Sequence, residues 1–219
     1  MNNKKMYEKI IKIINGDKNT PQILEEIRKE LETEILLNGK SANNSIKQAF
    51  KRLQKETEIR PRFQNVLKTP ENTYTITNTY FLITYTNEQL PTELKPYIEK
   101  EGNEPIDLYY NKVKNTNETN LLSLNFMALE KIYKYNKLNK LRNIFTLQNG
   151  YTFNLQYFMD IMALLNYKDI SQMRFAISEK LIEPMNIETP NGNAILLPIR
   201  MDAEDIENQL KLQDEIING

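Results

Sequence analysis

The sequence contains no cysteine and no histidine, and its six glycines do not cluster. Without cysteine there is no disulfide framework, and without histidine most structural zinc sites are excluded too. Histidine is the commonest proton-transfer residue near neutral pH and cysteine the strongest common nucleophile, so an enzyme would depend on carboxylates, Lys, Tyr or Ser/Thr. Scattered glycines also exclude a glycine-rich phosphate-binding loop.

The acidic residues offer no clear route to catalysis. Asp160, Asp169, Glu179 and Glu183 stand singly, without the spacing of a metal-binding motif. We therefore expect a protein that is not an enzyme, with no catalytic residues, no metal site and no cofactor.

Long hydrophobic runs are missing as well. No apolar stretch approaches the roughly 20 residues of a membrane-spanning helix. The N-terminus interleaves its apolar residues with Lys and Glu, unlike a signal peptide. Hydrophobic residues are 40% of the 219 and charged residues 26%, which is typical of a globular protein with a buried core. The sequence predicts a cytoplasmic protein without a membrane partner.

Charge is balanced overall but unevenly distributed. The chain has 29 basic and 29 acidic residues. Residues 40–68 hold eight basic and two acidic residues, a net charge of +6, whereas residues 202–219 carry a net charge of −5. A basic segment on a neutral chain indicates a local anionic partner rather than a protein-wide field.

The hydrophobic period of residues 151–201 predicts one helix followed by three strands. Asn154 can cap a helix whose apolar residues recur every three to four positions. Strand-length runs follow at Met173–Ser178, Leu181–Glu188 and Ala194–Arg200, the last two joined by a Pro-Asn-Gly-Asn turn.

Residues 44–86 show the same order of elements. A helix is expected at Ile46–Thr57 and a strand at Phe63–Thr69. The run Tyr74–Tyr85 breaks near Asn78 into two further strands. No residue-by-residue identity links the two copies, so the repeat is one of pattern only.

A polar excursion separates the two copies. Residues 87–120 contain one expected strand, Ile106–Tyr110, and a Lys-rich helix follows at Leu124–Asn139. Before the first copy, Met6–Asn15 and Gln22–Leu37 are expected to be helices, and this pair could equally be an oligomerisation hairpin.

These patterns define an α+β fold in three parts. The parts are an N-terminal helical extension at 1–40, a domain at 41–201 with an insertion at 87–141, and an acidic C-terminal helix or tail at 202–219.

Two short motifs carry a resemblance to a known family. The pair Phe153-Asn154 introduces the second helix, and the run Leu197-Pro198-Ile199-Arg200-Met201 closes the last strand. With the repeated helix-plus-three-strand pattern, they resemble a domain of the bacterial DNA sliding clamp, the beta subunit of DNA polymerase III. The chain is still more similar to single-domain clamp-like proteins of phages and prophages of low-GC Gram-positive bacteria. The resemblance covers residues 44–86 and 142–201 and implies a single clamp-like domain of two halves in a bacterial host cell.

A clamp meets duplex DNA through its helices, so the resemblance implies sequence-independent, salt-sensitive contacts with phosphate. The basic residues expected to make them are Lys47, Lys51, Arg52, Lys55, Arg60, Arg62, Lys131, Lys134 and Lys137. The second clamp helix, 154–166, departs from this pattern because its one charged residue is Asp160. The lysines could instead serve only to keep the helices soluble.

The resemblance also implies an apolar groove that holds partner proteins or clamp-binding peptides. Its expected residues are Phe153, Leu155, Leu197, Pro198, Ile199, Arg200 and Met201. In the tail, Gln209–Leu212 resembles the start of a clamp-binding peptide, but Gln213 stands where an aromatic anchor belongs. The alternative is an acidic amphipathic helix that lies on its own domain.

Two functions from different classes follow from these expectations. The first is a non-enzymatic clamp-like protein on duplex DNA. Since a closed ring has six such domains and this chain supplies one, a ring would need a homo-oligomer or other subunits. The alternative is a phage- or prophage-encoded interaction module, such as a host-factor partner, decoy or anti-defence protein, that keeps the clamp fold without encircling DNA.

Overall fold

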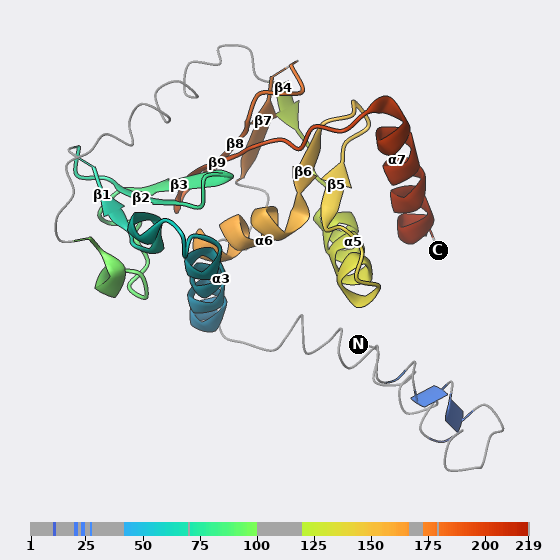
Figure 1. The fold of residues 1–219 in the computed structure, drawn as a ribbon, viewed down its shortest axis with the longest axis horizontal. Helices are drawn as coiled ribbons and strands as arrows, with labels where there is room; N and C mark the ends of the chain where they lie inside the picture. The colour runs from blue at the N-terminus through green and yellow to red at the C-terminus, as the bar shows by residue number, and fades with distance from the viewer. Residues whose placement is uncertain are drawn as a thin grey trace. The chain divides into compact units, whose positions relative to one another are not determined.

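The chain is an α+β protein in a computed structural model (Figure 1). The structure describes residues 42–69, 71–99, 120–166, 173–178 and 180–218, with six single positions between Ile11 and Ile27. Residues 1–41 and 42–219 form two separate compact units, and all elements named below belong to the second.

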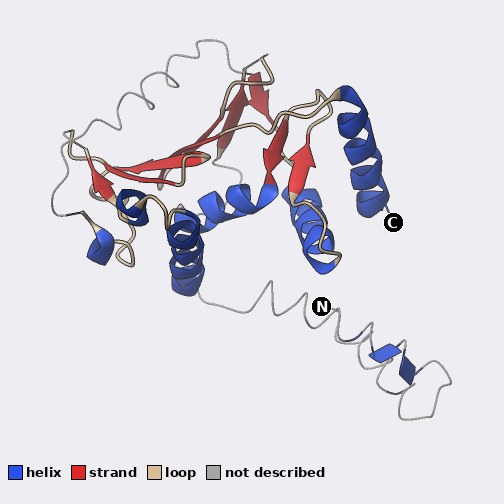
Figure 2. Cartoon of the chain, viewed as in Figure 1, coloured by secondary structure: helices blue, strands red, loops and turns tan. Residues whose placement is uncertain are grey.

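An antiparallel sheet of seven strands is the centre of this unit (Figure 2). In order across the sheet the strands are β1 (Leu67–Lys68), β2 (Tyr74–Thr77), β3 (Phe81–Tyr85), β9 (Gly192–Leu196), β8 (Met185–Thr189), β7 (Arg174–Ile177) and β4 (Asn120–Leu122). The last strands of the two predicted copies, β3 and β9, are hydrogen-bonded neighbours. The two three-stranded meanders are therefore parts of one continuous sheet.

One face of the sheet carries an apolar row. The register aligns Ile76, Ile83, Ala194, Ile187 and Phe175 on five successive strands, and each of these side chains is buried. Because directly opposed residues of paired strands point to the same face, this row forms one wall of the core.

Helices cover that wall. They are α3 (Ala42–Glu56), α5 (Phe126–Leu138) and α6 (Leu155–Leu164), whereas α7 (Ala203–Asn218) packs against α5 and residues 144–146. Figure 1 shows α3, α6 and α5 on the same side of the sheet. The rings of Phe126, Phe153 and Phe175 surround Phe158 of α6 at centroid distances of 5.6, 5.4 and 5.9 Å. This aromatic cluster joins α5 and α6 to strand β7, so the helices and the sheet share one core.

The starts of α6 and α5 have a visible cause, whereas α3 begins at Ala42, four residues before its predicted start at Ile46. The Asn154 side chain accepts a hydrogen bond from the Tyr157 backbone N–H at 3.1 Å, so the predicted cap of α6 is confirmed. Asn125 caps α5 in the same way through the Ala128 N–H at 3.2 Å. Each cap satisfies one of the N–H groups that have no partner in the first helical turn.

Some predicted strands are shorter in the structure. Phe63–Thr69 was expected to be one strand, but Pro61–Gln64 is a 3₁₀ turn and only Leu67–Lys68 pairs as β1. Proline favours this helical start because its ring fixes φ near −65°. The predicted strand Leu181–Glu188 also starts late, because residues 180–183 form a turn in which the Glu183 N–H donates to the Lys180 carbonyl at 3.0 Å, and β8 begins at Met185.

The last predicted strand, Ala194–Arg200, ends early because the chain changes neighbours. The Leu197 N–H still donates to the Tyr80 carbonyl at 2.9 Å, beside β3. Pro198 has no N–H to donate, and the Ile199 N–H donates to the Thr152 carbonyl at 2.8 Å. Residues 197–201, which we call the closing segment, thus leave the large sheet, and Ile199 pairs with a second one.

That second sheet is a hairpin of β5 (Ile144–Thr146) and β6 (Thr152–Asn154). Helix α7 covers its β5 side through Gln213, whose side chain is buried. The Gln213 Oε1 accepts from the Thr146 N–H and its Nε2 donates to the Thr146 carbonyl, both at 2.8 Å. The amide therefore pairs with the strand as a neighbouring peptide group would, and it protects an edge that could otherwise pair with another chain.

Replacing Gln213 with alanine should destabilise the protein by about 2 kcal/mol, because the buried Thr146 N–H and C=O would both lose their partner. Equilibrium urea unfolding measures this change. Asp214→Ala, at the exposed neighbouring position, is the control and should change the free energy of unfolding little. Equal stability of the Gln213→Ala variant and the unmodified chain would show that the amide contributes nothing.

Several predictions fall outside the described residues. These are the expected strand Ile106–Tyr110 and nearly all of the two expected N-terminal helices. Within the described ranges, no helix is both long and apolar enough to cross a membrane.

Candidate nucleic-acid interface

Helix α3 presents a row of lysines opposite its buried side. Ile46, Ala49, Phe50 and Leu53 are at most 2% exposed and pack into the core. Lys47, Lys51 and Lys55 are exposed. Residues four apart on an α-helix are rotated by about 40° from one another around the helix axis. The three lysines therefore span about 80° around the axis and about 12 Å along it. We call them the α3 lysine row.

The α3 lysine row has no acidic partner in the part of the chain that the structure describes. None of its three side chains forms an ion pair with a described carboxylate. Glu56, the acidic residue at the end of the same helix, accepts a hydrogen bond from the Asn78 side chain at 2.8 Å. The three ammonium groups are therefore available to an anion from outside.

Arg52 differs from the lysines because it binds a residue of α6. Its Nε donates to the Asp160 Oδ1 at 3.0 Å, and its Nη2 forms an ion pair with the same oxygen. The Asp160 side chain is 5% exposed and the Arg52 side chain 43% exposed. Burial raises the pKa of the Asp160 carboxyl, and the guanidinium partly offsets this shift. Much of the Arg52 charge thus compensates a buried carboxylate.

Asp160 also belongs to a chain of hydrogen bonds that crosses the helical layer. The Gln156 Nε2 donates to the Asp160 Oδ1 at 3.1 Å, and the Tyr133 hydroxyl donates to the Gln156 Oε1 at 2.7 Å. The Lys137 Nζ lies 3.4 Å from the Tyr133 hydroxyl and 5.4 Å from the centre of its ring. These contacts connect α5 and α6, and Arg52 extends them to α3.

The α5 lysines are engaged by the protein itself. The Lys131 Nζ donates to the Ile217 carbonyl in the last turn of α7 at 2.9 Å, a favourable place for a cation. Lys134 forms an ion pair with Glu130 at 3.6 Å. Since Lys137 contacts Tyr133, each of the three α5 lysines expected to contact DNA has a partner within the protein.

The two arginines that follow α3 have different surroundings. Arg60 is exposed, and the Arg62 Nε lies 3.7 Å from the Glu99 Oε2. Of the nine basic residues predicted to meet DNA, the α3 lysine row and Arg60 are therefore exposed and without a side-chain partner among the described residues.

The predicted partner groove divides between the core and the surface. Phe153 and Leu155 are completely buried, so neither can contact a partner in this conformation. Leu197 is 39% exposed, Arg200 is exposed, and Pro198, Ile199 and Met201 are half-buried. The accessible part of the prediction is thus the closing segment alone.

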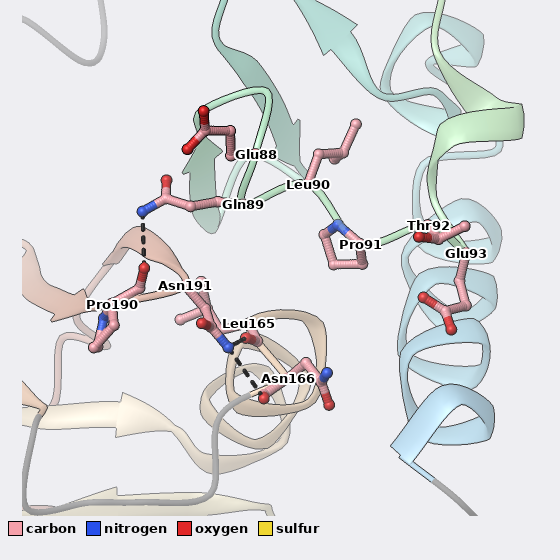
Figure 3. A pocket seen from close by; sticks show the side chains of 10 residues that line it. All are labelled: Glu88, Gln89, Leu90, Pro91, Thr92, Glu93, Leu165, Asn166, Pro190 and Asn191. Carbon is pink, nitrogen blue, oxygen red and sulfur yellow. Dashed lines mark hydrogen bonds between the residues drawn. The ribbon is translucent and has the colours of Figure 1, made fainter.

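A cavity of about 480 Å³ lies elsewhere, between the loop 88–93, the end of α6 and the β8–β9 turn (Figure 3). Two of its polar side chains, Gln89 and Asn191, bind backbone carbonyls of the lining. The Asn191 Nδ2 donates to the Leu165 carbonyl at 3.0 Å and the Asn166 carbonyl at 3.3 Å, and the Gln89 Nε2 donates to the Pro190 carbonyl at 2.9 Å. The Asn191 bonds close the end of α6, and the side chains of Glu88, Thr92 and Glu93 at the other side of the cavity have no hydrogen bond or ion pair among the described residues.

Sequence reasoning missed the partner of Arg52. The one available signal was that Asp160 is the single charged residue in an otherwise apolar helix, which suggests a buried ion pair. Among the described residues, no group of three acidic side chains is arranged to hold a metal ion.

No family model, no curated protein and no solved structure matches this chain.

Proposed function

We propose that this protein is a non-enzymatic, clamp-like protein that associates with duplex DNA through the α3 lysine row. The observation that carries the proposal is that Lys47, Lys51 and Lys55 are aligned, exposed and without an ion-pair partner among the described residues. Surface lysines spaced along one helix can contact successive phosphates without reading bases.

Binding of this kind depends strongly on the salt concentration. Each lysine that neutralises a phosphate releases condensed counterions, so the affinity falls steeply as salt rises. The balanced total charge of the chain means that attraction to DNA depends on this local row and not on a protein-wide field.

The order of elements supports the clamp-like part of the proposal. A helix followed by three strands occurs twice, as α3 with β1, β2 and β3, and as α6 with β7, β8 and β9. We propose that these are the two halves of a clamp-like domain, with α3 and α6 packed side by side on the face that meets DNA. In this arrangement α3 supplies the charge, and Asp160 holds α6 against it through Arg52.

The proposal is tested by comparing two duplexes of the same length and unrelated sequence in a fluorescence anisotropy titration. We expect similar affinities for both at low salt and the loss of binding to both as salt is raised. A strong preference for one sequence, or no binding at low salt, would count against the proposal.

A second candidate function is a protein-interaction module with the same fold. It is favoured by the state of α6, whose single charge is neutralised by Arg52 and which therefore adds nothing basic to the helical face. Its partners would meet the closing segment at Leu197 and Arg200. This function would be favoured if the chain binds no DNA but binds a partner protein, and if Leu197→Asp removes that binding.

A further inference from the structure

Two tyrosines form a stacked pair beside α3. The rings of Tyr80, in the turn between β2 and β3, and Tyr157, on α6, have centroids 5.5 Å apart and planes inclined by 17°. Phe81 contacts the Tyr157 ring from another side, at 5.9 Å and 58°. Tyr80 is nevertheless 57% exposed. A large aromatic ring is thus fixed against a second ring while much of its own surface remains in solvent.

The turn that carries Tyr80 is held firmly. The buried Asn78 Oδ1 accepts from the backbone N–H groups of Tyr80 and Phe81, both at 3.0 Å. The Tyr80 carbonyl accepts from the Leu197 N–H at 2.9 Å. Thr79 adopts a φ of 77°, a conformation that these bonds stabilise. The ring is therefore presented in one place, which lowers the entropy that a ligand must overcome to stack on it.

The pair also lies at the end of the α3 lysine row. The Asn78 Nδ2 donates to Glu56 at 2.8 Å, which connects the turn to the last residue of α3, next to Lys55. Arg52, one turn earlier, contacts Asp160 on α6, three residues after Tyr157. Burial, then Glu56 and Tyr80, raises the pKa of Tyr157 to about 12, so its hydroxyl is uncharged at neutral pH. The exposed aromatic surface thus lies near the Lys55 end of the α3 lysine row, with Glu56 as an acidic neighbour. An aromatic ring with lysines farther along the same surface can bind a nucleotide through its base and its phosphate.

From this juxtaposition we infer that the Tyr80–Tyr157 pair is a binding site for an unpaired nucleobase. The inference rests on the proposed function and adds a class of DNA to it, because bases inside a duplex are already stacked. Only a single-stranded segment offers a free face. The strand would stack a base on Tyr80 while the adjoining duplex lies along the α3 lysine row, so the preferred ligand is a junction between double- and single-stranded DNA. Stacking is tolerant of sequence, since every base has a π-face.

The test compares a blunt duplex with the same duplex carrying an oligothymidine overhang, by fluorescence anisotropy at constant salt. The junction should bind about tenfold more tightly than the blunt duplex, in line with the effect of a single stacked base. Tyr80→Ala should remove this preference and leave blunt-duplex binding unchanged. Tyr80→Phe, which keeps the ring, should retain the preference. Tyr135→Ala, at another exposed tyrosine on α5, should retain it too.

A direct readout uses 2-aminopurine in the overhang, whose fluorescence should be quenched by the unmodified chain and not by Tyr80→Ala. Equal affinity for the two DNAs would overturn the inference while leaving the proposed function intact. An overhang preference that survives in Tyr80→Ala would also overturn it. If no duplex binds the unmodified chain at low salt, the proposed function itself fails.

Discussion

Replacing Lys47, Lys51 and Lys55 together with glutamine should lower the affinity for duplex DNA on the order of a hundredfold at low salt. All three side chains are exposed and have no ion-pair partner among the described residues, so the substitutions remove contacts with DNA without breaking contacts within the protein. Glutamine is uncharged and is a good helix former, so α3 should remain folded.

The matched control removes the same number of positive charges elsewhere. Arg174 on β7, Lys180 before β8 and Lys211 on α7 are exposed, and their joint replacement by glutamine changes the net charge equally. Fluorescence anisotropy should show a small effect for this control and a large one for the α3 variant. Equal losses in both would mean that only the net charge matters and that α3 is not the interface.

Replacing Arg52 with alanine should destabilise the protein by about 3 kcal/mol at neutral pH, because the buried Asp160 carboxylate would lose its ion-pair partner. This is the lower end of the usual loss of stability when one partner of a buried ion pair is removed, and it applies because the Arg52 side chain is partly in solvent. Only the Gln156 amide would still donate to the Asp160 oxygen. Urea unfolding measures the change, and circular dichroism shows whether the helices persist.

The pH dependence of this loss has a definite sign. Burial already raises the pKa of Asp160, and removing Arg52 should raise it further. Asp160 is neutral in both folded and unfolded chains below its unfolded pKa, so the penalty is absent there. It grows as pH rises from that value through the raised folded pKa. A loss of stability that is the same at acidic and neutral pH would show that the effect is not the unpaired carboxylate.

A double variant separates the ion pair from packing. Replacing Arg52 with methionine and Asp160 with leucine removes both charges, and leucine keeps the branching of aspartate at Cγ. We expect it to be far more stable than Arg52→Ala, since a buried pair can often be exchanged for apolar residues at little cost. If DNA binding also survives in this variant, Arg52 has a positioning role and the α3 lysine row makes the contacts.

Local signals in the sequence were enough to predict α3, α5 and α6. Asn154 and the apolar spacing after it predicted the start of α6, and the four-residue spacing of lysines opposite buried Phe50 and Leu53 predicted α3. The break near Asn78 correctly divided β2 from β3. In each case the decisive interaction lies within a few residues along the chain.

Long-range contacts could not be predicted in this way. Arg52 and Asp160 are 108 residues apart, and Gln213 and Thr146 are 67 apart. Sequence spacing does not determine that Gln213 acts as a peptide group on a strand edge, or that Phe153 and Leu155 enter the core instead of lining a groove. Nor does any local signal bring Tyr80 onto Tyr157. The lysines of the candidate interface could thus be predicted from the sequence, whereas the contacts of Arg52, Tyr80 and Tyr157 follow only from the fold.

The most direct test of the central claim is the salt dependence of duplex binding by the unmodified chain and by the variant with glutamine at positions 47, 51 and 55. A plot of log affinity against log salt should be linear and negative for the unmodified chain, and its slope should be smaller by about three in the variant. Identical slopes for the two proteins, or no binding by the unmodified chain at low salt, would contradict the proposal that the α3 lysine row binds DNA.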